Sequence, residues 1–558
     1  MAGTQAGSSR IPHFDLVLVV VLACFVPSSD LLHTGLVSFG LLALWWPSRR
    51  RWTYGIESAK RDAALLSLAL AMLTAATVGD ITRLVQGEVR ASNFFHYYLG
   101  AKYFAELGYE DLYVAALVAD HEHDGYWSEK ISEARDLGSY EIVPREQLED
   151  GFTPGERFTA ERWRSFKEDV AALAGYRRAE RWSNVFRDRG YNGTPFWTSI
   201  GRASAALVPA TSSWLPVLAF IDPVLLALTA LLVSRTFGRR RSVLVLLLFV
   251  ASPTNTARLI GGFLQADWLC AMAAGLCFYH RRRPALAGAL MAYAIMTRVF
   301  PVILIAFALL PALVQGVRCR HIAPRLRRYA LSCVLSCVVA LAIGTANGRG
   351  PQAWLEWVEA ISLHREHHVA GERRIGLEHA FTGDFRQMRE KADATDRART
   401  LEMRQPWVWT AKLLLVGMLA AAALGGRSWN AQILGLGAVF SLLVLSRYYF
   451  GAAALMPLFM VDGASRRRLL AGGQMAAFLL YGAAVLAGAD WHGSYSLMNA
   501  LLAVYFVGTA GLPLWRRLRA SPSSDSAGES LTHVRTPAEA ERLVSVPVTE
   551  GKSPPSRP

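Results

Sequence analysis

The sequence has few cysteines, few charged residues and none of the short motifs that mark common soluble enzymes. It contains no glycine-rich phosphate loop, no nucleophile elbow and no CxxC pair, so nothing supports the nucleotide chemistry of soluble enzymes. The six cysteines all lie in apolar segments or beside basic clusters, and we expect no disulfides among them; they are Cys24, Cys270, Cys277, Cys319, Cys333 and Cys337.

Apolar residues make up 53% of the 558 residues and charged residues only 18%, and the mean hydropathy is +0.24. This composition, with its long apolar blocks, predicts an all-α polytopic membrane protein with about 14 transmembrane helices. The predicted spans are 14–28, 31–47, 62–79, 213–234, 242–256, 264–279, 285–298, 301–317, 329–345, 407–425, 430–446, 451–463, 469–488 and 496–514.

The net charge of +15 does not indicate nucleic-acid binding, because the basic residues form short clusters between the apolar blocks. Clusters such as Arg281 to Arg283 are typical of cytoplasmic span ends. Residues 80–212 instead carry 21 acidic against 16 basic residues, which predicts a large exterior loop after the third span.

The charge pattern therefore predicts three parts. Residues 1–61 form an N-terminal transmembrane hairpin, residues 62–519 a membrane domain, and residues 520–558, rich in Ser, Pro, Glu and Arg, a disordered cytoplasmic tail. The membrane domain contains two exterior polar loops, 80–212 and 346–405. The first is expected to be mostly helical.

Aromatic residues crowd the start of the first loop, between Phe94 and Tyr113. Their density predicts a re-entrant or interfacial helix at the lipid headgroup layer. Further along, apolar residues recur every three or four positions in 159–182, which predicts an amphipathic helix with one apolar stripe; the stripe is Ala160, Trp163, Phe166, Val170, Leu173 and Tyr176.

Polar residues at the ends of the predicted spans gather on the exterior side. Ionisable groups at membrane depth usually face a protein interior or a water-filled cavity, so these residues are site candidates. They are Asp80, Asn93, His96, Gln265, Asp267, Arg298, His364, His367, His368 and Arg447.

Arg298, Asp267 and the histidines can also be interpreted as residues with a purely structural role. Arg298, at a predicted helix break before Pro301, is suited to binding phosphate oxygens or to snorkelling at a helix end. Asp267 is suited to accepting a hydrogen bond from a sugar hydroxyl or to pairing with Arg298. The spacing of His364 and His368 fits a metal site, although a solvated polar face fits it better.

The aromatic Tyr97-Tyr98 helix and the segment GGFLQADWLC…TRVFPVILIAFALL resemble the bacterial polyprenol-phosphate-mannose-dependent mannosyltransferases of the C-type glycosyltransferase superfamily. The resemblance covers roughly residues 60–465. It implies a multi-pass protein of the cell (inner or plasma) membrane that takes a sugar from a polyprenyl-phosphate donor at the outer face. No further cofactor or metal follows from it.

The family's acid before Tyr-Tyr corresponds to Asn93, and an amide cannot act as the general base. The resemblance therefore implies either that Asp80 or His96 deprotonates the acceptor, or that activity is altered or absent. The resemblance implies that the motif residues bind substrate, and we expect Arg298, together with Arg447, to hold the carrier phosphate. The expected substrate-binding residues are Asn93, Tyr97, Tyr98, Gln265, Asp267, Arg298 and Arg447.

Three functions follow as hypotheses. The first is a hexosyltransferase that uses a lipid-linked sugar donor, contacts membrane lipids and modifies a glycan or lipid acceptor. The second is a polytopic transporter or lipid flippase, although the sequence shows no internal repeat. The third is a non-catalytic relative of the enzyme family, which Asn93 favours.

Overall fold

The computed structural model describes residues 67, 78, 81–123, 125–127, 130–176, 181–210, 213–251, 261–319, 322–366, 374–383, 394–424, 426–459 and 491–519. The first two predicted spans, the third span apart from residues 67 and 78, the span 469–488 and the tail 520–558 lie outside these ranges. The chain divides into two compact units, Met1–Ala510 and Gly511–Pro558. The described part of the second unit is the end of helix α25 (Trp491–Arg519).

The first predicted loop folds into a mostly helical polar domain, which we define as the described residues between 81 and 210. A short antiparallel ladder pairs Glu133–Arg135 (β1) with Ile142–Pro144 (β2). The helices around it are α4 (Ala91–Asn93), η2 (Phe94–Leu99, a π-helix), α5 (Gly100–Lys102), α6 (Phe104–Leu107), α7 (Leu112–Glu122), α8 (Arg145–Asp150), α9 (Pro154–Arg157), α10 (Ala160–Ala174), α11 (Ser183–Phe186) and α12 (Pro195–Ala205).

The aromatic stretch forms the core of this polar domain, and the prediction of an interfacial helix is therefore wrong. Phe95 is fully buried and contacts Trp127, Trp182 and Phe186 through ring edges, at centroid distances of 5.3 to 6.0 Å. Tyr98, Tyr103, Phe104 and Tyr113 are fully buried as well. Aromatic density alone does not distinguish a headgroup layer from a protein core, because both environments take rings with one polar atom.

The predicted amphipathic helix is confirmed as α10, which begins where the Thr159 side chain accepts a hydrogen bond from the Arg162 amide. Its buried face includes Trp163, Phe166, Val170 and Leu173. The predicted period of three to four residues therefore identified both the helix and the side that packs on the domain.

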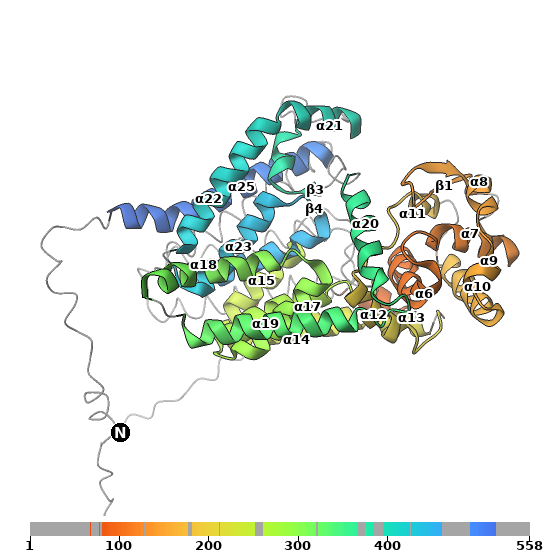
Figure 1. Cartoon of the computed structure of the whole chain (residues 1–558), viewed down its shortest axis with the longest axis horizontal. Coiled ribbons are helices and arrows are strands. Elements are labelled where there is room, and N and C mark those ends of the chain that lie inside the picture. The colour runs from red at the N-terminus through yellow and green to blue at the C-terminus, as the bar shows by residue number, and fades with distance from the viewer. Residues whose placement is uncertain are drawn as a thin grey trace, which may run out of the picture. The chain divides into compact units, whose positions relative to one another are not determined.

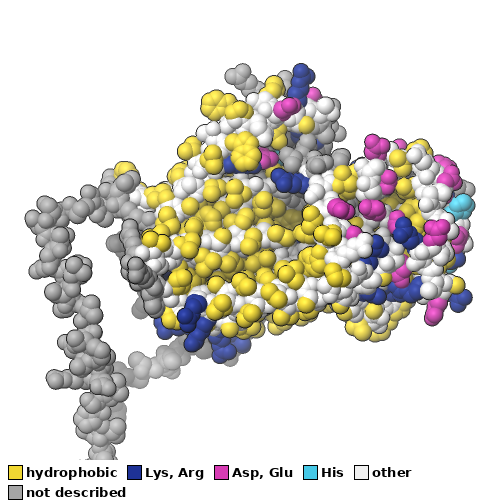
Figure 2. Space-filling view, in the orientation of Figure 1, with side chains coloured by type: hydrophobic (Ala, Val, Ile, Leu, Met, Phe, Trp, Pro, Cys, Tyr) yellow, Lys and Arg dark blue, Asp and Glu magenta, His cyan; other side chains and the backbone are white. Residues whose placement is uncertain are grey.

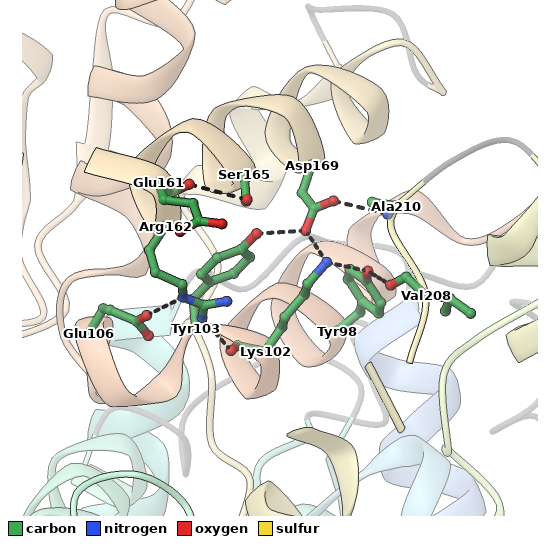
Figure 3. A network of polar contacts seen from close by, with 10 residues as sticks. All are labelled: Tyr98, Lys102, Tyr103, Glu106, Glu161, Arg162, Ser165, Asp169, Val208 and Ala210. Carbon is green, nitrogen blue, oxygen red and sulfur yellow. Dashed lines mark hydrogen bonds and ion pairs between the residues drawn. The ribbon is translucent and has the colours of Figure 1, made fainter. Parts of the chain in front are cut away.

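A polar network joins α10 to the aromatic core and to the end of the domain (Figure 3). Lys102 Nζ lies 2.6 Å from Asp169 Oδ2, which also accepts a hydrogen bond of 2.8 Å from the Tyr103 hydroxyl. Asp169 Oδ1 accepts from the Ala210 amide at 2.9 Å, and Lys102 donates to the Tyr98 hydroxyl at 3.0 Å. Both charges are nearly buried, and each has its hydrogen-bond partners.

Long apolar helices make up most of the rest of the described chain (Figure 1). Four of them are long and apolar enough to cross a membrane: Trp214–Phe237, Pro324–Ile343, Gln405–Leu424 and Gly493–Trp515. They indicate a membrane protein. The helices of this region are α13 (Trp214–Ala219), α14 (Ile221–Phe237), α15 (Arg239–Ala251), α16 (Asp267–His280), α17 (Pro284–Arg298), α18 (Val302–Cys319), α19 (Pro324–Ile343), α22 (Gln405–Leu424), α23 (Ser428–Leu442) and α25.

Large apolar side chains are exposed along these helices. Val338 of α19 is 58% exposed, Leu413 of α22 71% and Leu228 of α14 58%. Figure 2 shows apolar side chains spread over this region, whereas most of the acidic side chains in view lie over the polar domain. Contiguous exposed apolar surface of this kind is suited to lipid contact.

Two short strands pair with each other outside the long helices. Arg374–Ile375 (β3) pairs antiparallel with Leu445–Ser446 (β4), so the fold is mostly helical but not all-α. The predicted span 451–463 is replaced, in its described part, by a 3-10 helix, η6 (Arg447–Leu458). The second predicted polar loop, residues 346–405, contains the helices α20 (Gln352–Glu366), η5 (Leu377–Phe381, a 3-10 helix) and α21 (Ala394–Met403).

The two predicted polar loops meet at α20. The hydroxyl of Tyr140 shares a hydrogen bond of 3.0 Å with Nδ1 of His364, and Arg349 donates to the carbonyl oxygen of Ala105 at 3.4 Å. In Figure 1, α20 stands between the polar domain and the long helices. His364, for which the sequence favours a solvated polar face over a metal site, is thus engaged by Tyr140, and His367 and His368 lie outside the described residues.

Candidate functional site

The predicted break ahead of Pro301 is present and sets the position of Arg298. Helix α17 ends at Arg298, and Val299 follows with a φ of 41° before α18 begins at Val302. A β-branched residue at positive φ is a backbone outlier, so the surrounding packing has to impose it. The break leaves Arg298 as the last residue of its helix.

Arg298 lies between two aromatic rings that come from distant parts of the chain. Its guanidinium carbon is 6.0 Å from the ring centroid of Tyr97 and 5.5 Å from that of Tyr449. Tyr97 belongs to η2 of the polar domain and Tyr449 to η6. Cation–π contacts of this kind stabilise the positive charge without neutralising it.

The hydrogen-bonding capacity of Arg298 is largely unused. Its Nε is buried without a hydrogen-bond partner, and its Nη1 makes one long contact of 3.4 Å to the Thr297 carbonyl oxygen. Among the described residues no carboxylate forms an ion pair with it. Arg298 as a whole is half-buried, so the unpaired donor is its Nε, and a buried donor of a charged group is costly unless an acceptor binds it.

Asp267 begins helix α16 close to Arg298, and its charge acts on that arginine. Its Oδ2 accepts hydrogen bonds from Trp197 Nε1 at 3.1 Å and from the Tyr293 hydroxyl at 2.9 Å, and its Oδ1 accepts from the Trp268 amide at 2.7 Å. The carboxylate is buried but fully hydrogen-bonded. It is therefore held in place by the protein, and the predicted ion pair with Arg298 does not form.

Hydrogen bonds from the backbone and from one side chain hold the loop before α16, residues 261–266, to the polar domain. Asn93 Oδ1 accepts a hydrogen bond of 2.7 Å from the Phe263 amide, and Arg90 Nη1 donates to Gln265 Oε1 at 2.8 Å. The fully buried carboxylate of Asp222 accepts from the Gln265 amide, at 2.8 Å. Asn93 and Gln265 therefore hold this loop against η2.

Tyr97 connects the two halves of the site. Its hydroxyl donates to Asn192 Oδ1 at 2.9 Å, and its ring meets the Trp197 ring edge-on at a centroid distance of 5.3 Å. Burial raises the pKa of Tyr97 to about 12, so the hydroxyl stays neutral and remains a donor near pH 7. Tyr97 thus contacts Trp197, which donates a hydrogen bond to Asp267, and the ring of Tyr97 makes a cation–π contact with Arg298.

The other predicted residues lie apart from this cluster or outside the description. His96 is buried in the core of the polar domain, where its Nε2 shares a hydrogen bond of 2.8 Å with the Tyr113 hydroxyl. The Tyr98 hydroxyl donates to the Val208 carbonyl oxygen at 2.6 Å and belongs to the network of Figure 3. Arg447 begins η6, beside Tyr448 and Tyr449. Asp80 lies outside the described residues.

Sequence reasoning missed Asp222, Trp197, Tyr293 and Tyr449. A signal existed for Asp222, because an acidic residue within an apolar segment is itself a site candidate. No signal existed for Trp197 or Tyr293, since aromatic residues are ordinary in such segments. Their role depends on which helix faces which.

Comparison with protein families, curated proteins and solved structures finds no match for this chain.

Proposed function

We propose that this chain is an integral membrane glycosyltransferase that moves a sugar from a polyprenyl-phosphate carrier to an acceptor hydroxyl. The observation that carries the proposal is Arg298, a guanidinium with unpaired donors set between Tyr97 and Tyr449. A phosphate ester offers two anionic oxygens that the planar guanidinium can bind through two N–H donors at once. The apolar surface of the neighbouring helices is suited to the carrier's hydrocarbon chain.

In this reaction the acceptor oxygen loses its proton to a base and attacks the anomeric carbon. The bond between that carbon and the phosphate oxygen breaks, and polyprenyl phosphate leaves with the electron pair. Arg298 stabilises the charge that develops on the phosphate. Both oxygens of Asp267 are engaged by Trp197, Tyr293 and the Trp268 amide, so in this proposal Asp267 fixes the site beside Arg298 and does not contact the sugar.

The base in this proposal is Asp80 or His96. Burial lowers the pKa of His96, so its imidazole is neutral and able to accept a proton at pH 7. Its hydrogen bond with Tyr113 and its place in the core, however, leave no open path to an acceptor. We therefore favour Asp80 as the base.

The proposal includes about 14 spans in the cell membrane, with the polar domain and α20 on the outer face. The four long apolar helices and the acidic character of the polar domain support this topology. Cysteines introduced at the exposed residues Ser139 and Glu156 should react with a membrane-impermeant maleimide in intact cells. Labelling only after the cells are opened would place the domain on the other face.

The test of function uses the purified full chain with labelled polyprenyl-phosphate sugar and with a short-chain prenyl phosphate. Arg298→Ala should weaken prenyl-phosphate binding by about 100-fold, the value of a charge-assisted bidentate contact, and should abolish release of polyprenyl phosphate. Arg298→Lys should recover only part of the binding, because an ammonium lacks the fork geometry. Arg328→Ala, an exposed arginine on α19, is the control. Unchanged binding by Arg298→Ala would reject the proposal.

A non-catalytic lipid-phosphate-binding protein is the second candidate, and the contact of Asn93 favours it. The Asn93 amide is committed to the Phe263 backbone, so the position of the family's base is structural here. Under this alternative the wild-type chain binds prenyl phosphate at Arg298 but releases none from the sugar donor. The same two assays therefore separate the two candidates.

A further inference from the structure

A cavity lies within the polar domain, formed by residues between Glu110 and Arg157. Its volume is about 280 Å³, and its walls come from the turn before α7, the β1–β2 ladder and the helices α8 and α9. None of the residues of the Arg298 cluster lines it. The cavity is therefore a separate feature of the chain, and the function proposed above makes no use of it.

The walls of this cavity contain more acidic than basic side chains. Carboxylates of Glu110, Asp111, Asp136 and Glu156 line it together with the amide of Gln147. Partial burial raises the pKa of Glu110, and the neighbouring carboxylates of Asp111 and Asp136 raise it further. Four carboxylates and two guanidinium groups line the cavity, so the lining carries a net negative charge.

The two arginines of the cavity are already engaged. Arg157 Nη2 lies 3.5 Å from Asp111 Oδ2. Arg135 donates through Nε to the carbonyl oxygen of Asp188 at 2.9 Å and through Nη2 to that of Arg187 at 3.1 Å. The charge of Arg349, outside the lining, also acts on Glu110. The remaining net negative charge disfavours a negatively charged ligand.

The carboxylates of Glu110 and Glu156 make no hydrogen bond or ion pair to another residue within the described part of the chain. Gln147 and the Thr153 hydroxyl add further polar atoms, and the half-buried ring of Phe152 supplies an apolar wall. Among the described residues no set of three side chains is arranged to hold a metal ion. The lining suits a ligand with several hydroxyl donors and one apolar face.

We propose that this cavity binds a carbohydrate, one sugar ring in size, whose hydroxyl groups donate to Glu110, Glu156 and Gln147 while one ring face packs on Phe152. The volume of about 280 Å³ lies just below the roughly 300 to 1,000 Å³ typical of small-molecule sites, which suits a single ring. Carboxylates accept such hydrogen bonds strongly because the acceptor is charged.

This site is independent of sugar transfer, so its failure would leave the proposed function untouched. If both hold, the cavity provides a place for the glycan of an acceptor. Its rim adjoins α20, since Glu356 and Glu359 also act on Glu110. The site would then bind the acceptor through a sugar other than the one that reacts.

The experiment measures binding by saturation-transfer NMR on the purified full chain in detergent. The probes are the methyl glycosides of glucose, galactose, mannose and N-acetylglucosamine, with putrescine as a cationic comparison. We expect saturable binding of at least one glycoside. Glu110→Ala and Glu156→Ala should each weaken that binding at least tenfold, since each removes a charged acceptor.

Glu146→Ala is the matched control, because Glu146 is an exposed glutamate on α8 that does not line the cavity. It should bind the glycoside as the wild type does. All three substituted positions are on the surface, so the variants should fold. The proposal is overturned if no glycoside binds, if only putrescine binds, or if the three variants lose affinity equally.

Discussion

The buried pair of Lys102 and Asp169 offers a quantitative test of the polar domain. Their side chains are only 12% and 6% exposed, and the pair is held by Tyr103 and the Ala210 amide (Figure 3). Replacing Lys102 by methionine keeps most of the side-chain volume but leaves the carboxylate buried without its countercharge. Breaking a buried pair in this way costs about 3–5 kcal/mol.

The measurement is amide hydrogen exchange of the full chain in detergent, followed by mass spectrometry. Peptides from α10 and from the segment that ends at Ala210 should exchange at least about 100-fold faster in Lys102→Met, since 1.4 kcal/mol corresponds to a factor of ten. Peptides of α22 and α23, which take no part in the network, are the internal reference.

The double variant Lys102→Met with Asp169→Asn separates charge from packing. An asparagine oxygen still accepts a hydrogen bond from the Ala210 amide or the Tyr103 hydroxyl, and no buried charge remains uncompensated. Most of the lost protection should therefore return. If the double variant exchanges as fast as Lys102→Met, or if the single variant exchanges like the wild type, the electrostatic account of this network is wrong.

Two further predictions concern other buried positions. Burial lowers the pKa of His96 below 6.5, so as the pH falls the unfolded chain takes up a proton at this histidine before the folded chain does. Protection of the polar domain against hydrogen exchange should therefore be highest above pH 6.5 and decline toward the lower folded-state pKa, by at most about 1.4 kcal/mol per pH unit. The variant His96→Gln should show a flatter pH dependence in the same exchange measurement. On α17, a Cβ added at Gly288 would clash with the Tyr329 carbonyl oxygen of α19, so Gly288→Ala should destabilise the chain by about 1–3 kcal/mol. In a thermal aggregation assay this variant should aggregate at a lower temperature than the wild type. The control Gly417→Ala should aggregate as the wild type does, because a Cβ at Gly417 meets no atom within 4 Å.

Sequence patterns a few turns long correctly predicted helices and helix ends, because these depend mainly on residues close in the sequence. The stripe of Trp163, Phe166 and Val170 identified α10, and the apolar run 213–234 corresponds to the helix Trp214–Phe237. The proline at 301 located the end of α17, because a residue before proline disfavours helical backbone. Each of these signals is contained within a few turns of chain.

The failures share one cause. The stretch from Phe94 to Tyr113 has the composition of an interfacial helix, but partners more than 30 residues away, such as Trp127 and Trp182, convert it into a core. Tyr98 was expected to bind substrate, yet Lys102 and Val208 engage its hydroxyl. A side chain's availability depends on what packs against it, and composition does not record this.

The sequence by itself determined that apolar helices dominate, that one acidic helical domain interrupts them, and that Arg298 stands at a break. Only the tertiary structure decided that Tyr97 and Tyr449 flank Arg298 while its Nε has no partner, and that Asp267 is held by Trp197 and Tyr293. Periodicity reports which face of a helix is buried, whereas a site depends on which faces meet, and that follows from packing across the whole chain.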